Sequence, residues 1–281
     1  MQIATNLMID ALLECVRAAG AAITTIYAAA AEGVNCELGD KADGAGPLTL
    51  ADIAAHRILC EGLHQINGAI SVVSEEDYNT HTLRREDGQF WLIDPLDGTK
   101  EFNARTGEFT VNVALVENGY PTIGVVYAPV LKELFWNVPG KGAFKDDGHQ
   151  VRRIHTADVP TNAVLRVVAS RSHLDEATRA FITNLGAHSL IQAGSSLKFC
   201  RVAEGSADIY PRFGPTCEWD VAAAQAILEA AGGHVCTMDG LRLRHAKTSI
   251  INQAFIACSA ALRDSDTSSI SARLRAQDYS A

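Results

Sequence analysis

A short apolar run that ends at two acidic residues constrains the fold of this 281-residue chain more than any other feature. Phe90-Trp-Leu-Ile93 has the composition of a buried strand, and Asp94-Pro-Leu-Asp97-Gly-Thr99 follows it directly. Because Pro95 cannot donate a hydrogen bond to a neighbouring strand, we expect the strand to stop at Asp94-Pro95. Acidic side chains at the ends of strands are typical of functional sites in layered α/β proteins, and we expect that fold class here.

Four acidic residues stand at the end of an apolar strand or at the start of a helix: Glu75, Asp94, Asp97 and Asp220. Mg²⁺ prefers oxygen ligands and keeps several waters, so a few carboxylates and a substrate phosphate are enough to bind it. Gly98 lets the backbone approach a phosphate, and Thr99 adds an N–H group and a hydroxyl. Taken singly, each acid is better explained as a turn residue or a helix cap, and it is the whole run over residues 94–102 that favours a functional site.

Regular patterns in the first half of the chain predict two helices and a largely antiparallel sheet. Apolar residues at helical spacing predict a helix over residues 5–31, followed by a loop over 33–46. Thr49 is a good N-cap for a second helix that runs through Leu63. Turn residues then divide a predicted antiparallel meander into strands near residues 109–117, 122–128 and 133–137.

In the second half of the chain, predicted strands and helices alternate. The strands cover residues 165–170, 189–192 and 207–210, and the helices cover about 172–185, 196–204 and 220–231. The change of pattern falls near residues 150–162. We therefore predict an N-terminal α+β domain with the metal site over 1–155, a C-terminal α/β domain over 156–262, and a polar tail over 263–281.

Charge and composition restrict the class of partner. The formal net charge of −9 argues against a nucleic-acid polymer, because binding one requires a basic surface. No apolar run is long enough to span a bilayer, and residues 1–31 lack the basic start of a signal peptide, so we expect a folded helix there and no transmembrane segment. Seven scattered cysteines without a Cys-x-x-Cys pair predict reduced thiols and a cytoplasmic location.

Three separated motifs resemble those of the lithium-sensitive, magnesium-dependent phosphatases of the inositol monophosphatase superfamily. In the family's order they are Ser74-Glu-Glu76, Asp94-Pro-Leu-Asp-Gly-Thr99 and Trp219-Asp-Val-Ala-Ala223. Within the superfamily, the chain resembles the bacterial CysQ group of 3′(2′),5′-bisphosphate nucleotidases. This similarity is carried by residues 94–102, 107–112, 124–129, 170–173, 194–200 and 210–215, and it covers about residues 5–262.

The resemblance implies a fold and a set of metal ligands. The fold would be a layered α-β-α-β-α sandwich of the sugar and inositol phosphatase type, with a mixed and antiparallel N-terminal sheet and a smaller α/β C-terminal half. Two or three Mg²⁺ ions would bind. Glu75, Asp94 and the carbonyl oxygen of Leu96 would hold the first ion, and Asp94, Asp97 and Asp220 the second. Glu75 is also a candidate ligand of a third ion.

The same resemblance assigns the catalytic steps. Asp52 and Thr99 would orient and deprotonate the attacking water, with Glu75 as a further member of the catalytic set. Asp52 has a second explanation, because Thr49-x-x-Asp52 also fits a capping box, and the two roles are compatible. A Mg²⁺-dependent hydrolysis of this kind needs no phosphoenzyme, since electrostatic stabilisation of the phosphoryl group carries most of the catalysis.

The implied substrate is a small phosphorylated nucleotide. The enzyme would hydrolyse the 3′-phosphate of adenosine 3′,5′-bisphosphate and so give AMP and phosphate in sulfur assimilation. Phosphoadenylyl sulfate is a further candidate substrate. Besides the metal ligands, the predicted substrate contacts are Gly98, Thr99, Ser195, Lys198 and Arg212. The stretch Gly194-Ser195-Ser196-Leu-Lys198 is explained equally well as a capped helix with a solvated lysine.

The sequence leaves two rival functions open. An inositol-phosphate phosphatase would share every metal ligand and differ only around the substrate. A metal or nucleotide sensor without catalysis would not need the pair Asp52 and Thr99. The resemblance also leaves open a homodimer, and peripheral attachment to the cytoplasmic face of the inner membrane, as alternatives to a monomer free in the cytoplasm.

Overall fold

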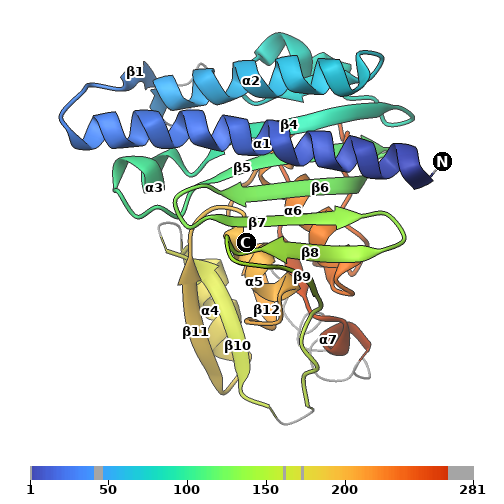
Figure 1. The fold of residues 1–281 in the computed structure, drawn as a ribbon. Helices are drawn as coiled ribbons and strands as arrows, with labels where there is room; N and C mark the ends of the chain where they lie inside the picture. The colour runs from blue at the N-terminus through green and yellow to red at the C-terminus, as the bar shows by residue number, and fades with distance from the viewer. Residues whose placement is uncertain (1, 41–46, 161–162, 172–173, 265–281) are drawn as a thin grey trace.

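The computed structural model describes residues 2–40, 47–160, 163–171 and 174–264. Most of the predicted polar tail, residues 265–281, lies outside this part of the chain. Two sheets dominate the described residues, one of seven strands and one of five, and helices lie on both sides of each (Figure 1). The domain boundary expected near residue 155 falls between the two sheets and stays a prediction.

The seven-stranded sheet has the strand order β3-β4-β5-β6-β7-β8-β9. Its first pair, β3 and β4, is parallel, and every later pair is antiparallel, which confirms the predicted meander. The bounds are β3 Ser71–Ser74, β4 Gln89–Asp97, β5 Thr110–Glu117, β6 Tyr120–Ala128, β7 Glu133–Val138, β8 Gly142–Asp146 and β9 Val151–Ile154. A short 3-10 helix, η1 (Tyr78–Leu83), connects β3 to β4.

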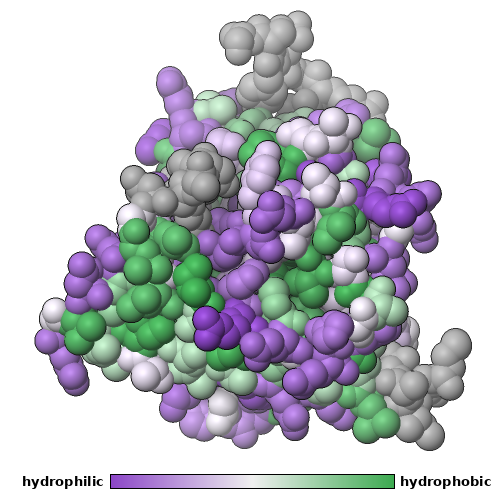
Figure 2. Space-filling model, turned by 90° about the horizontal axis from the view of Figure 1, so that it is seen from above, coloured by the Kyte–Doolittle hydropathy of each residue, from purple (hydrophilic) through white to green (hydrophobic). Residues whose placement is uncertain are grey.

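Two long helices, α1 (Gln2–Ala31) and α2 (Leu50–Asn67), cover one face of this sheet (Figure 1). Their apolar sides bury Leu12, Ile23 and Leu59 against strand residues such as Trp91 and Ile93. The predicted loop over 33–46 in fact contains strand β1 (Glu37–Asp40), which pairs with β2 (Pro47–Thr49). Seen from above, hydrophobic side chains gather at the left end of this helical layer, near β1 (Figure 2).

The second layer of helices, α5 (Leu197–Ala203) and α6 (Glu218–Ala230), lies between the two sheets. One apolar cluster joins Phe90 and Phe135 of the larger sheet, Leu197 and Ala223 of these helices, and Phe255 of the smaller sheet. Because both faces of these helices are covered, nearly all of their residues are buried, polar ones included. This middle layer positions the functional site.

The five-stranded sheet has the order β11-β10-β12-β14-β13. The bounds are β10 Leu165–Ser170, β11 His188–Ala193, β12 Ile209–Arg212, β13 His234–Thr237 and β14 Phe255–Cys258. Its outer face packs against α4 (Glu176–Asn184) and α7 (Ala260–Asp264), through residues such as Phe181 and Leu262. The layers therefore follow the predicted order α-β-α-β-α. No helix in the described residues is long and apolar enough to cross a bilayer.

Three predicted boundaries are wrong in an informative way. Strand β4 does not stop at Asp94-Pro95 but continues to Asp97, with an irregular register that leaves Pro95 out of the pairing. Helix α4 begins only after Asp175, whose carboxylate accepts a hydrogen bond from the Thr178 N–H at 2.8 Å. Helix α6 begins at Glu218, two residues before the predicted start.

Candidate active site

A bulge in β4 brings two carboxylates to one side of the sheet. Asp94 pairs with Asn112 and Asp97 pairs with Thr110, so β4 has one more residue than β5 between these pairs. In a regular strand, residues three apart point to opposite faces. The extra residue reverses this alternation, and the Leu96 N–H donates to Asp94 Oδ1 at 3.0 Å within the bulge. The acidic pair therefore depends on the sequence Asp-Pro-Leu-Asp as a unit.

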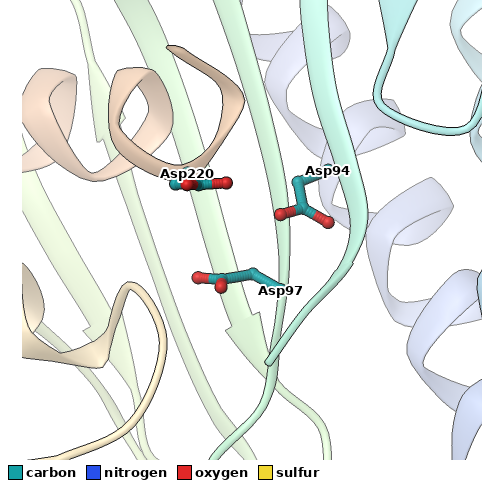
Figure 3. A group of neighbouring side chains, drawn as sticks. All are labelled: Asp94, Asp97 and Asp220. Carbon is teal, nitrogen blue, oxygen red and sulfur yellow. The ribbon is translucent and has the colours of Figure 1, made fainter. Parts of the chain in front are cut away.

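The third carboxylate, Asp220, comes from the first turn of α6. Its Oδ2 accepts a hydrogen bond from the Cys217 N–H at 2.7 Å, which fixes the side chain at the helix start. The side chains of Asp94, Asp97 and Asp220 converge from β4 and α6 (Figure 3), and each offers an oxygen within 4.8 Å of the other two. Among the described residues, this is where acidic side chains gather closely enough to share a cation.

Neutral hydrogen-bond donors hold Asp97 in this group. Ser196 Oγ lies 3.1 Å from Asp97 Oδ2, and Asn112 Nδ2 lies 3.4 Å from the same oxygen and donates to Ser196 Oγ at 2.9 Å. Burial raises the pKa of Asp97, while the nearby Lys198 ammonium and the Ser196 hydrogen bond oppose the rise. A divalent cation would relieve the same electrostatic cost directly.

The donor set fits Mg²⁺. It consists of carboxylate oxygens, without sulfur or imidazole in the group, and Leu96 of the bulge lines the same cleft. Glu75 lines the same cleft from the end of β3, where its N–H donates to the Ile93 carbonyl at 3.2 Å. The structure thus brings three of the four predicted acids into one group and places the fourth in the surrounding cleft.

The two residues expected to handle water lie in different surroundings. Thr99 is the first residue of the short helix α3 (Thr99–Asn103), after Gly98 with φ of 96°, and both line the cleft. Asp52 is fully buried in the first turn of α2. Its Oδ2 accepts from the Thr49 N–H at 2.8 Å and from the Thr49 hydroxyl at 2.6 Å, so the capping box is confirmed.

Lys198 lies in the interior, so the alternative of a solvated lysine is wrong. Its side chain is only 7% exposed in the cleft wall, and its Nζ donates to the Ser195 carbonyl at 2.6 Å. Burial lowers the pKa of Lys198 to about 8, although Asp97 opposes the shift. Helix α5 is not capped by a side chain, because Ser196 bonds to the aspartates instead.

Ser195 and Arg212 also face the cleft. Ser195 adopts φ of 50°, and its hydroxyl donates to the Asp97 carbonyl at 2.7 Å, which ties the loop before α5 to the acidic group. Arg212 ends β12 and donates to the carbonyls of Gly214 and Pro215 at 3.2 and 3.1 Å. The cleft has a volume of about 830 Å³ and runs from the aspartates to Lys198 and Arg212.

Sequence reasoning missed several residues of this cleft. Asn112 and Ser196 lie in segments that carry the family resemblance, but their contacts with Asp97 join residues 15 and 99 positions apart in the chain. His81, Tyr210 and Trp219 add aromatic rings to the cleft lining. For Trp219, the signal was its place directly before Asp220, whereas His81 stands in a segment without any recognisable pattern.

Known proteins resemble this chain over most of its length. The family model described as the inositol monophosphatase family matches residues 6–273. The chain is 45% identical over 249 residues to the 3′(2′),5′-bisphosphate nucleotidase CysQ of Salmonella typhimurium, covering 88% of this chain and 98% of that protein. The corresponding CysQ of Escherichia coli K12 is 43% identical over 250 residues, with the same coverage.

A solved structure shares the fold of this chain. The crystal structure of CysQ from Bacteroides thetaiotaomicron, a bacterial member of the family, matches with a TM-score of 0.75 and 40% identity, covering 89% of this chain and 96% of that one. Members of the family generally depend on Mg²⁺, in agreement with the cluster of carboxylate oxygens described above. The resemblance inferred from the three motifs is confirmed, and the chain belongs to the inositol monophosphatase family.

Proposed function

We propose that the chain is a Mg²⁺-dependent phosphatase that hydrolyses the 3′-phosphate of adenosine 3′,5′-bisphosphate to AMP and phosphate. The observation that carries the proposal is the joint presence of two charged regions in one cleft. Asp94, Asp97 and Asp220 form an acidic group, and Lys198 and Arg212 lie along the wall of the same cleft. A substrate with two phosphates can use both regions at once.

The acidic group would bind the metal and, through it, the phosphate that is cleaved. Glu75, Asp94 and the Leu96 carbonyl would hold one Mg²⁺, and Asp94, Asp97 and Asp220 a second, with Glu75 also available to a third. When bound, Mg²⁺ supplies the positive charge that lowers the pKa of water and stabilises the phosphoryl group. The backbone of Gly98 and Thr99, at the start of α3, would orient the phosphate.

Thr99 and Asp52 would handle the attacking water. Thr99 lines the cleft, and its hydroxyl would accept a hydrogen bond from that water and orient it towards phosphorus. Asp52 would complete the proton transfer while it also caps α2 through Thr49. Because Asp52 is fully buried, a proton that it accepts would be kept away from bulk solvent.

The basic wall would select a nucleotide that carries a 5′-phosphate. Lys198 is a compact buried cation, and Arg212 offers guanidinium donors beside it. Ser195 would contribute its main chain and hold the loop in place through Asp97. The names of the CysQ relatives agree with a 3′,5′-bisphosphate substrate. The sulfur-containing analogue phosphoadenylyl sulfate has the same 3′-phosphate and is a second expected substrate.

The test is phosphate release from a panel of substrates with Mg²⁺ and with a chelator. The panel contains adenosine 3′,5′-bisphosphate, phosphoadenylyl sulfate, inositol 1-phosphate and fructose 1,6-bisphosphate. We expect the adenosine bisphosphate to give the highest kcat/KM, and the chelator to abolish release. Preference for inositol phosphate would support the rival phosphatase, and absence of release from every substrate would support a sensor.

A cytoplasmic location, a homodimer and attachment to the inner membrane stay predictions.

A further inference from the structure

The candidate metal site is assembled from two parts of the chain that lie far apart in the sequence. Glu75 follows β3 at an edge of the seven-stranded sheet, whereas Asp220 belongs to α6 in the layer behind it. Any shift of α6 against this edge would change the separation of their side chains. A site that binds Mg²⁺ needs near-ideal oxygen geometry, so a contact that fixes this separation would have a functional effect.

One side chain touches both parts. His81 lies in η1, and its Nε2 is 3.0 Å from the carbonyl oxygen of Ser74, the residue before Glu75. Because a carbonyl oxygen only accepts hydrogen bonds, Nε2 is the protonated nitrogen of the ring. The centre of the same ring lies 4.9 Å from that of Trp219, the residue before Asp220, at an angle of 44° between the ring planes.

The position of His81 is itself fixed from both sides. Arg84 Nε donates to the His81 carbonyl at 3.1 Å, and Arg84 Nη1 donates to Glu218 Oε2 at 3.0 Å. Glu218 is fully buried in the first turn of α6, two residues before Asp220. Directly before His81, the Thr80 hydroxyl accepts a hydrogen bond from the Ser74 N–H at 3.1 Å. The segment 80–84 therefore contacts both the end of β3 and the start of α6.

We propose that His81 is a positioning residue of the metal site, which ties the backbone before Glu75 to the indole before Asp220. This inference rests on the proposed function, because it takes these two acids as metal ligands. His81 uses Nε2 to hold the backbone and its ring to contact Trp219. His81 acts on the metal site through Ser74 and Trp219. Its loss therefore weakens metal binding more than it weakens recognition of the nucleotide.

The experiment measures binding of Mn²⁺ alone, since Mn²⁺ shares the oxygen preference of Mg²⁺ and its free concentration is read by electron paramagnetic resonance. The variants are His81→Ala, His81→Gln and His81→Phe. Gln keeps an N–H donor for the Ser74 carbonyl, and Phe keeps a ring against Trp219. His149→Ala is the matched control, because His149 is exposed in the turn between β8 and β9.

We expect His81→Ala to raise the Kd for Mn²⁺ by about tenfold, as for other residues that orient metal ligands without touching the metal. Gln and Phe should each recover part of the loss, and His149→Ala should bind like the wild type. The KM for adenosine 3′,5′-bisphosphate at saturating Mg²⁺ should change by less than about twofold, because the basic wall of the cleft is untouched.

Two results distinguish the inference from the proposed function. Wild-type Kd values in all His81 variants, with or without a lower Tm, would overturn the positioning role and show that the contact is structural only. A wild-type protein that binds Mn²⁺ but releases no phosphate from the substrate panel would overturn the proposed function instead. If His81→Ala fails to fold, His81→Gln and His81→Phe carry the same test, because each keeps one of the two contacts.

Discussion

The hydroxyl oxygen of Ser196 lies 2.7 Å from the main-chain carbonyl oxygen of Asp220, so the loop before α5 is joined directly to the first turn of α6. The same hydroxyl lies 3.1 Å from Asp97 Oδ2 and accepts a hydrogen bond from Asn112 Nδ2. Ser196 therefore contacts two of the three clustered aspartates without being a ligand candidate itself. It connects the basic wall of the cleft to the acidic group.

Removal of this hydroxyl is expected to affect the metal requirement. Ser196→Ala should raise the Mg²⁺ concentration for half-maximal activity by about tenfold, because Asp97 loses a partner that orients it. The KM for substrate at saturating Mg²⁺ should change much less. Ser206→Ala is the control, since Ser206 is exposed and its hydroxyl serves only the end of α5. Equal Mg²⁺ requirements in the two variants would contradict the role of Ser196.

The buried Lys198 predicts a pH dependence of substrate binding. Burial lowers its pKa to about 8, so the cation is lost as the pH rises through this value, well below the ordinary range of lysine. The KM for adenosine 3′,5′-bisphosphate should therefore rise between about pH 7 and about pH 9. Adenosine 3′-monophosphate lacks the 5′-phosphate and is the matched control substrate. A parallel rise of KM for both substrates would contradict the assignment of Lys198 to the 5′-phosphate.

Glu218 should contribute strongly to stability. Its fully buried carboxylate bonds Arg84 Nη1 at 3.0 Å and Lys247 Nζ at 2.6 Å, and it accepts the N–H groups of Ala246 and Lys247. Glu218→Gln leaves both cations without their counterion and should lower the free energy of unfolding by about 3 kcal/mol. Urea denaturation measures this change.

The control for this variant is Glu86→Gln. Glu86 pairs with Arg244 at 2.5 Å, but both side chains are well exposed to solvent. Such surface pairs contribute less than about 1 kcal/mol, so Glu86→Gln should leave the midpoint of denaturation nearly unchanged. Similar losses in both variants would show that burial does not set the contribution of Glu218.

The acidic group could be predicted from the sequence because its chemistry is local. Asp94, Asp97 and Thr99 follow one apolar strand within six residues, and Asp220 follows a tryptophan at a helix start. The expected end of β4 was wrong because Pro95 does not end the strand. The bulge excludes only residues 95 and 96 from pairing with β5, and the ladder resumes at Asp97.

The surroundings of the group could not be predicted, because they depend on how the two sheets pack. In the sequence, a buried lysine on a short helix cannot be distinguished from a solvated one. Lys198 is buried because α5 lies between the two sheets. The contact of Ser196 with Asp97 crosses 99 positions of the chain for the same reason. Strands β13 and β14, of four residues each, were missed because so short a run shows no clear periodicity.

We expect the clustered aspartates to form the Mg²⁺ site on which phosphate release depends. The most direct measurement is the rate of phosphate release from adenosine 3′,5′-bisphosphate by Asp94→Asn across a Mg²⁺ titration. Asn keeps an oxygen for the Leu96 N–H, so the bulge should persist. Asp147→Asn is the matched control, because partly exposed Asp147 lies in the turn between β8 and β9 and does not line the cleft. We predict a loss of about a thousandfold in kcat for Asp94→Asn and none for the control. Turnover like that of the wild type in Asp94→Asn would contradict the claim.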